Sequence, residues 1–183
     1  MSVPDQDRIV VDRGGVVVVA RGPVILVIDR GTGPLATLGF VLGLLALVSG
    51  GFGTVSLIVA VIGEGAVGVP VSVAAIFLIV GIVLAVGALL VSHAIRARRE
   101  RPLESYRPTA VFDRAGRVYL DGSGTVLAPL DQVRFLRRAQ IGSSSPKLVA
   151  VTPTGSWVLK RGNPFDGGIG NLDQVLTAAV HGR

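Results

Sequence analysis

Two long uncharged runs constrain this chain more than any other feature. No Asp, Glu, Lys or Arg occurs in the 33 positions 31–63 or, after Glu64, in the 28 positions 65–92. Only 16% of the chain is charged, against about a quarter of a typical soluble domain. A bilayer core about 30 Å thick is crossed by roughly 20 apolar helical residues. The runs therefore predict two membrane-spanning helices, at about residues 35–62 and 71–95.

A signal peptide is the main alternative for the first run. Its apolar core is short, about 7–15 residues, and directly follows a basic leader. Here the first 30 residues contain four Asp and four Arg before the apolar run begins. We therefore expect the first run to be a span.

Basic residues flank the two predicted spans on one side only. Four Arg precede the first span and five follow the second, whereas the connecting segment GEGAVGVP has none. These arginines are Arg8, Arg13, Arg21, Arg30, Arg96, Arg98, Arg99, Arg101 and Arg107. Because basic flanks are retained on the cytoplasmic side, we expect a multi-pass protein of the cytoplasmic membrane with both termini inside.

Small residues are frequent in both spans. Gly39 and Gly43 form a GxxxG pair in the first span, and Gly81 and Ala85 form a small-xxx-small pair in the second. Such pairs let helices approach closely, so we assign these four residues to helix packing. The segment VSGGFGTVS, residues 48–56, favours a continuous helix of the same kind. The alternative, a broken helix around a transport site, needs ionisable partners that neither span has at its middle.

Short β-branched runs lie on both sides of the spans. Residues 8–29 predict three strands and residues 109–161 predict six, separated by turns rich in Asp, Gly, Ser and Pro such as GSSSP. Three short strands alone would be marginal, so the economical fold joins both sets in one domain with the helices inserted between them. The expected parts are strands in 1–33, a hairpin in 34–95, a basic linker in 96–107 and a β domain in 108–183.

A final amphipathic helix is expected after residue 170. Asn171 is a favourable N-cap, and Gln174 three residues later completes a capping-box pattern. One face carries apolar residues at i, i+3, i+4 and i+7: Leu172, Val175, Leu176 and Ala179.

A meander closed by such a helix, with a helical hairpin before it, resembles small bacterial (actinobacterial-type) membrane proteins that have a pleckstrin-homology-like (PH-like) cytoplasmic domain. The resemblance implies a membrane α + β fold with an antiparallel β domain, and binding to proteins or lipids.

Residues for catalysis or metal binding are scarce. The chain has no Cys and two His, His93 and His181, neither beside a carboxylate at a ligand spacing. Ser144 and Lys147 match S-x-x-K by letter, but they lie in a loop that contains Pro rather than on a helix. We therefore expect no enzyme, no cofactor and no metal.

Basic residues also cluster late in the chain. A cationic surface is expected from Arg134, Arg137, Arg138, Lys147, Lys160 and Arg161. It could face an anionic membrane or an acidic partner, or it could be a solvated face without a ligand. Aromatic residues are only 5% of the chain, so stacking platforms for nucleic acid are not expected.

These patterns lead to two functional hypotheses. The first is an accessory or scaffold subunit that binds a membrane-protein partner, or a second copy of itself, through its hairpin and β domain. The second is a membrane sensor that binds anionic lipids. The residues expected to contact lipid or partner are Arg96, Arg98, Arg99, Arg101, Arg134 and Arg138.

Overall fold

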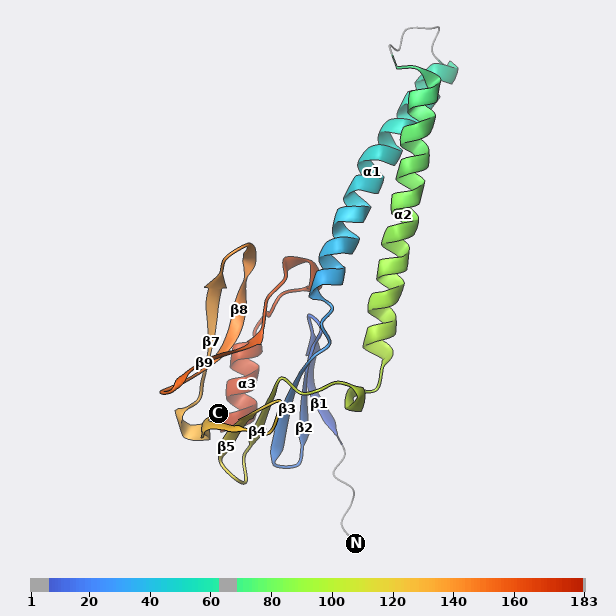
Figure 1. Cartoon of the computed structure of the whole chain (residues 1–183). Helices are drawn as coiled ribbons and strands as arrows, with labels where there is room; N and C mark the ends of the chain where they lie inside the picture. The colour runs from blue at the N-terminus through green and yellow to red at the C-terminus, as the bar shows by residue number, and fades with distance from the viewer. Residues whose placement is uncertain (1–6, 63–68, 183) are drawn as a thin grey trace. The chain divides into compact units, whose positions relative to one another are not determined.

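The computed structural model describes residues 7–62 and 69–182, and these form two compact units (Figure 1). The β unit contains residues up to Gly33 and those from Arg98 onward, and the helical unit is Pro34–Ala97. The elements are β1 (Arg8–Arg13), β2 (Val16–Arg21), β3 (Val24–Asp29), α1 (Gly33–Ile62), α2 (Val71–Glu100), η1 (Leu103–Ser105), β4 (Ala110–Asp113), β5 (Val118–Asp121), β6 (Val126–Pro129), η2 (Leu130–Gln132), β7 (Arg134–Gln140), β8 (Ser143–Thr152), β9 (Gly155–Lys160), η3 (Pro164–Asp166) and α3 (Leu172–His181).

The two predicted apolar helices are present. Both α1 and α2 have 30 residues and are long and apolar enough to cross a membrane, by length and composition. The Gly-rich segment 48–56 lies inside α1 without a break, as the close-packing interpretation expected. The predicted connecting loop falls mostly on residues 63–68, outside the described residues.

Helix α2 is longer than the sequence analysis expected. It continues past Ile95 to Glu100, so the first part of the expected basic linker is helical. Arg, Ala and Glu, the residue types of positions 96–100, all tolerate a helix, and the first breaker is Pro102.

Six antiparallel strands form the larger sheet of the β unit, in the order β1-β2-β3-β4-β5-β6. The pairing of β3 with β4, from Val24 opposite Asp113 to Val27 opposite Ala110, joins the strands that precede the helices to those that follow them. Strands from before and after the helices therefore build one sheet, and the helical unit is inserted in its β3–β4 connection.

The smaller sheet has the order β7-β8-β9. Strand β8 begins at Ser143, whereas the sequence analysis expected the Ser-rich segment to be a turn. The turn between β7 and β8 contains only Ile141 and Gly142, and Gly142 has a positive φ of 81° that glycine adopts without strain. Gln140 pairs with Ser143 directly across it.

Both sheets and α3 contribute to one apolar core. Phe112 stacks on Tyr119 at 4.8 Å and meets Phe135 edge to face at 5.2 Å, which links the two sheets. Helix α3 adds Leu172 and Leu176 to the same core, as its periodicity predicts.

The predicted side-chain cap of α3 does not form. Asn171 stands at the N-cap, but its side chain makes no capping hydrogen bond. Its backbone carbonyl accepts hydrogen bonds from the N–H groups of Gln174 and Val175 instead.

The opposite face of the larger sheet has its own small cluster. Val17, Val19 and Ile28 are buried there, and Leu103 and Tyr106, from the segment that follows α2, pack against them. This segment, which was expected to be only a basic linker, therefore also covers part of the sheet.

Candidate functional site

Two close approaches between α1 and α2 inside the helical unit involve glycines. A Cβ atom on Gly81 of α2 would overlap the backbone of Gly50 on α1. Similarly, a Cβ on Gly53 would overlap the backbone of Leu78. Glycine therefore allows the two backbones to approach at these positions. The sequence analysis placed close packing in the Gly-rich segment but did not single out Gly50 and Gly53.

The four predicted packing residues do not share one surface. Gly81 is buried inside the hairpin, and a Cβ on Gly39 would lie 3.3 Å from a methyl carbon of Val91 on α2. By contrast, Gly43 has open space around it, and Ala85 is exposed. Gly39 and Gly81 thus serve the hairpin itself, and only Gly43 and Ala85 are open to a second molecule.

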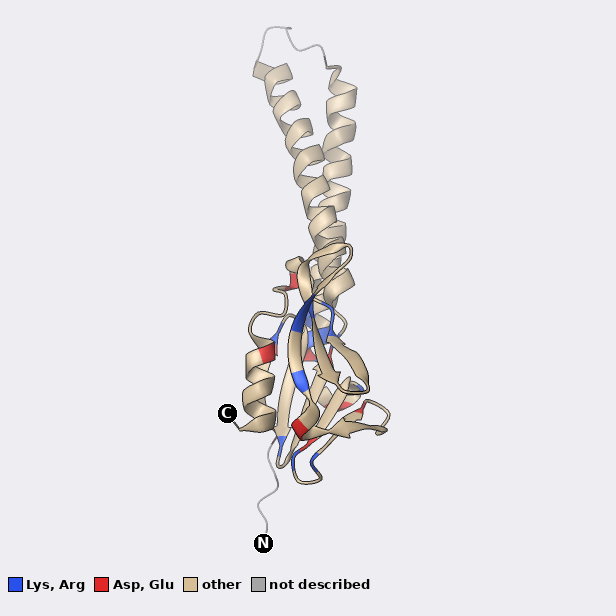
Figure 2. Ribbon diagram, turned by 90° about the vertical axis from the view of Figure 1, so that its left-hand side faces the viewer, with Lys and Arg blue, Asp and Glu red and all other residues tan. Residues whose placement is uncertain are grey.

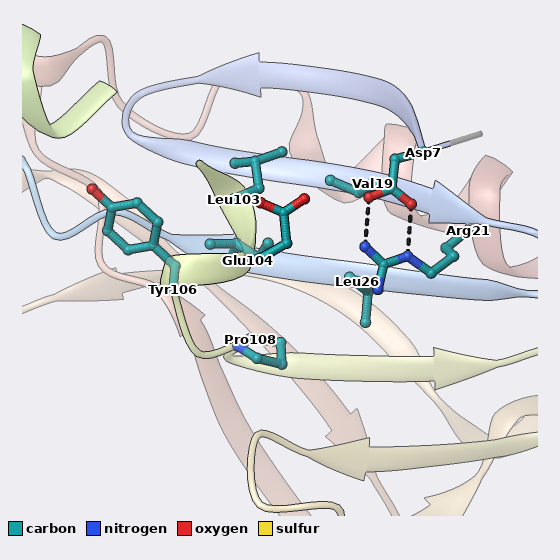
Figure 3. A pocket seen from close by; sticks show the side chains of 9 residues that line it. Asp7, Val19, Arg21, Leu26, Leu103, Glu104, Tyr106 and Pro108 are labelled. Carbon is teal, nitrogen blue, oxygen red and sulfur yellow. Dashed lines mark hydrogen bonds and ion pairs between the residues drawn. The ribbon is translucent and has the colours of Figure 1, made fainter. Parts of the chain in front are cut away.

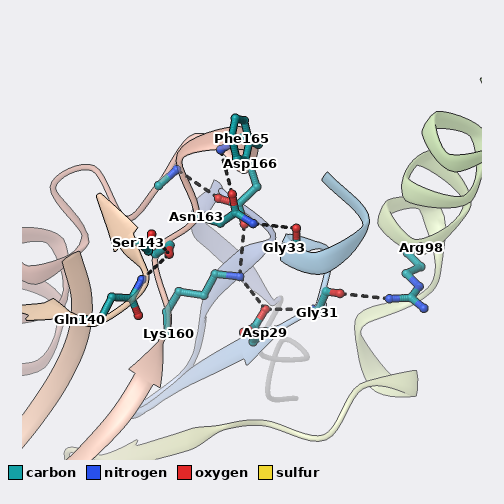
Figure 4. Close-up of polar contacts among 12 residues, drawn as sticks. Asp29, Gly31, Gly33, Arg98, Gln140, Ser143, Lys160, Asn163, Phe165 and Asp166 are labelled. Carbon is teal, nitrogen blue, oxygen red and sulfur yellow. Dashed lines mark hydrogen bonds and ion pairs between the residues drawn. The ribbon is translucent and has the colours of Figure 1, made fainter. Parts of the chain in front are cut away.

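A buried polar network lies where the chain leaves the β unit for α1 (Figure 4). The side chain of Lys160 is only 3% exposed, and its Nζ lies 2.9 Å from Asp29 Oδ1 and 3.6 Å from Asp166 Oδ2. The Asp166 side chain is 1% exposed. Burial raises the pKa of this carboxyl above its ordinary value, and the charge of Lys160 partly offsets that effect.

The same network fixes the two points at which the chain leaves and rejoins the β unit. Asn163 Nδ2 donates to the carbonyl oxygen of Gly33 at 2.7 Å. Arg98 Nη1 donates to the carbonyl oxygen of Gly31 at 3.0 Å (Figure 4). We call the set Asp29, Gly31, Gly33, Arg98, Lys160, Asn163 and Asp166 the junction network. At its centre one lysine, Lys160, lies between two carboxylates.

The burial of Lys160 corrects the expectation that it belongs to a cationic surface. A buried lysine needs a carboxylate partner, and here the partner is Asp29, 131 positions earlier in the chain. Local sequence gives no signal of such a distant pair.

The predicted contact arginines lie in two groups. Arg96, Arg99 and Arg101 are exposed near the end of α2, whereas Arg98 is half-buried and used in the junction network. Arg134 and Arg138 are exposed on β7. Figure 2 shows Lys and Arg spread over the β unit, while the helices lack charge along most of their length.

A pocket of about 300 Å³ lies on the outer face of the larger sheet, which is the face turned away from the main core and covered in part by Leu103 and Tyr106 (Figure 3). Its floor is mainly apolar, from Val19, Leu26 and Tyr106 among others. At one side Arg21 binds Asp7 through two side-chain hydrogen bonds, and these lower the pKa of Asp7. No local pattern in the sequence indicates this pocket, because Leu103 and Tyr106, which help to line it, come from the segment that was expected to be a linker.

The remaining candidates for chemistry are dispersed. Within residues 7–62 and 69–182, no group of three or more His, Cys, Asp or Glu is placed to hold a metal ion. His181 Nε2 lies 3.1 Å from the carbonyl oxygen of Val133, so this ring is used inside the fold. Ser144 and Lys147 lie on strand β8 rather than on a helix.

No protein-family model, curated protein or solved structure matches this chain. Function is therefore inferred from the residues and their geometry.

Proposed function

We propose that this chain is a non-enzymatic integral membrane protein that acts as an accessory or scaffold subunit. In this proposal α1 and α2 form a transmembrane hairpin, both termini are cytoplasmic, and the β unit is a PH-like domain on the cytoplasmic side. The hairpin and the β unit together bind a membrane-protein partner.

One observation carries the membrane assignment. In the most apolar window of each long helix only 11% of the residues are buried within the molecule. Leu47 is 72% exposed and Val61 is 85% exposed, and both helices carry many other exposed large apolar side chains. Since burying one such side chain is worth about 1.5–3 kcal/mol, two helices of this kind require lipid or protein around them.

The charge distribution supports the orientation. Exposed arginines occur at the Glu100 end of α2 and in the β unit, and the sequence between the helices has no Lys or Arg. Basic flanks are retained in the cytoplasm, which supports a cytoplasmic β unit.

The scaffold role is supported by the open positions on the hairpin and by the junction network. Gly43 and Gly51 of α1 have no atom within 4 Å of a Cβ built on either of them, so a second helix could approach closely there. The junction network binds the β unit's residues at the points where the chain leaves for α1 and returns from α2. Such an arrangement suits a domain that is attached to a membrane hairpin.

The PH-like assignment is supported by the meander of antiparallel strands and by the closing helix α3.

The test is purification of the tagged full-length protein from its native membrane in mild detergent, in parallel with G43L/G51L. A Cβ atom at either position has open space around it, so we expect the hairpin to persist. We expect one stoichiometric partner that is lost in the double variant and kept in a matched L47I control. A protein accompanied only by lipid would overturn the scaffold proposal.

A second function, recognition of anionic lipid, is favoured by the exposed arginines Arg96, Arg99 and Arg101 next to a long apolar helix. Each basic residue near an anionic surface contributes about 1 kcal/mol. This function predicts that anionic lipid co-purifies with the protein and is lost when these three residues are replaced by Glu. Unchanged lipid content in that variant would contradict it.

A further inference from the structure

We propose that the β7–β8 hairpin, residues 134–152, is a membrane-docking loop. Ile141 at its tip inserts between lipid headgroups, and the basic side chains of Arg137, Arg138 and Lys147 bind lipid phosphates. This inference rests on the proposed transmembrane hairpin and adds a second, separate contact with an anionic bilayer. We call residues 134–152 the docking hairpin.

The tip of the docking hairpin has an unusual side chain for a turn. Two-residue hairpin turns usually contain Asn, Asp and Gly, because these adopt positive φ and remain hydrated. Here the turn is Ile141-Gly142, and Ile141 is fully exposed, with a relative exposure of 106%. A fully exposed aliphatic side chain at the end of a projecting hairpin is suited to insertion into an apolar environment.

The charge of the surrounding segment is entirely positive. From residue 132 to residue 165 there is no Asp or Glu, but there are four Arg and two Lys. One of these, Lys160, is neutralised by Asp29, so five basic residues remain in the smaller sheet and the residue after it. Anionic headgroups are the complementary surface for a segment that carries positive charge alone.

Basic side chains lie on both faces of the docking hairpin near its tip. Arg138 lies directly opposite Lys147 in the β7–β8 pairing, so these two side chains share one face. Arg137 is opposite Leu148 and therefore belongs to the other face. Together these cations flank the exposed Ile141.

Hydrogen bonds place the tip on the side of the β unit from which the chain leaves for α1. Gln140 Nε2 donates to the carbonyl oxygen of Gly162 at 2.6 Å, and Ser143 Oγ approaches the same oxygen at 3.4 Å. The next residue, Asn163, binds the carbonyl oxygen of Gly33, the first residue of α1 (Figure 4). Within the β unit, the turn at 141–142 and the exit of the chain at Gly33 are therefore at the same end.

A comparable turn at the other end of the β unit supplies a control. The β4–β5 turn contains Ala115, which is exposed, and Arg114 in this turn donates its backbone N–H to the carbonyl oxygen of Pro23. Pro23 precedes β3, whereas the chain leaves for α1 after the last residue of β3, Asp29. The Ala115 turn therefore lies at the end of the larger sheet opposite the exit to α1.

The experiment uses the absence of cysteine in the chain. I141C, A115C and L47C are each labelled with an environment-sensitive fluorophore in the full-length protein. The proteins are then placed in nanodiscs of phosphatidylcholine, with or without phosphatidylglycerol. We expect the probe at 141 to shift to the blue and to be quenched by lipid-borne nitroxides, more strongly with phosphatidylglycerol. The probe at 115 should report water in both membranes.

Charge reversal tests the basic residues separately. R137E/R138E/K147E in the I141C background should abolish the response to phosphatidylglycerol. A response that survives the three substitutions would overturn their role in docking. The probe at 141 overturns the inference if it is as hydrated as the probe at 115 in both membranes. Protection of position 141 only in native membranes, and not in pure lipid, would also overturn it, because a protein would then be the occupant.

The probe at Leu47 separates this inference from the proposed function on which it rests. If that probe reports water, the transmembrane hairpin is wrong. If it reports hydrocarbon while position 141 reports water, only the docking hairpin is wrong.

Discussion

The apolar residues of the β unit and those of the helical unit differ in their exposure. Four successive valines of β2, Val16 to Val19, are at most 1% exposed, because each face of the sheet is covered by another part of the chain. The leucines and valines of α1 and α2 instead remain largely exposed. Hydropathy alone thus does not show whether the chain itself covers an apolar residue; the fold shows it.

This contrast has a direct consequence for mutation. A buried side chain of the β unit is enclosed by other groups of the chain, so its loss leaves a cavity. An exposed side chain of the long helices is not enclosed by the rest of the chain, so its loss leaves no such cavity. Substitutions of the same chemical kind should therefore have unlike effects in the two regions.

The largest effect is expected for F112A. Phe112 is fully buried between Tyr119 and Phe135, and removing such a ring costs about 3–5 kcal/mol of unfolding free energy. F40A is the matched control, because Phe40 is exposed on α1. Denaturant unfolding of the full-length protein in detergent measures both, with Trp157 fluorescence for the β unit and helical circular dichroism for the helical unit. Equal losses would contradict the contrast between the two regions.

The next effect concerns the junction network. K160M leaves Asp29 and the buried Asp166 without their cation, and we expect a loss of about 3 kcal/mol. R101M, which removes an exposed charge, should change the unfolding free energy little. The same unfolding experiment measures both variants. A K160M protein as stable as the parent would show that the network does not hold the β unit together.

Local patterns in the sequence predicted the elements well. All nine strands, both apolar helices and α3 lie within a few residues of their expected positions, because alternation, uncharged length and helical periodicity are properties of neighbouring residues. The turn before Ser143 is shorter than expected. Serine and proline favour turns locally, but β8 pairs with β7 as far as Ser143, and this pairing with a second strand is not a property of neighbouring residues.

Contacts between distant parts of the chain could not be predicted in this way. The pairing of Lys160 with Asp29, and the cover that Leu103 and Tyr106 provide for the larger sheet, depend on how the strands come together. In the hairpin, composition predicted close packing, but which glycines face the neighbouring helix depends on the helix rotation. Gly39 and Gly81 therefore lie inside, and Gly43 lies outside.

That division of the glycines gives the third prediction. G81A should destabilise the helical hairpin by about 2 kcal/mol, because the added methyl group overlaps the backbone of Gly50. G43A adds a methyl group in open space and should be neutral or stabilise α1 by up to about 1 kcal/mol. Loss of helical circular dichroism during titration with a denaturing detergent measures both. Equal midpoints for G81A and G43A would place the helix interface elsewhere.

The smallest effect concerns pH and contrasts the two tyrosines of the chain, Tyr106 and Tyr119. Burial raises the pKa of Tyr119 from 10.0 to about 12, and the charge of Asp121 adds to this shift. Between these two values the folded protein retains a proton that the unfolded chain has lost. Its unfolding free energy should therefore fall as the pH rises from about 10 to about 12. Y119F removes this contribution, so the difference in unfolding free energy between the parent and Y119F should depend on pH only in that interval. Y106F, which alters the residue on the outer face of the sheet, serves as the control, and an identical alkaline profile for Y119F and the parent would contradict the buried position of Tyr119.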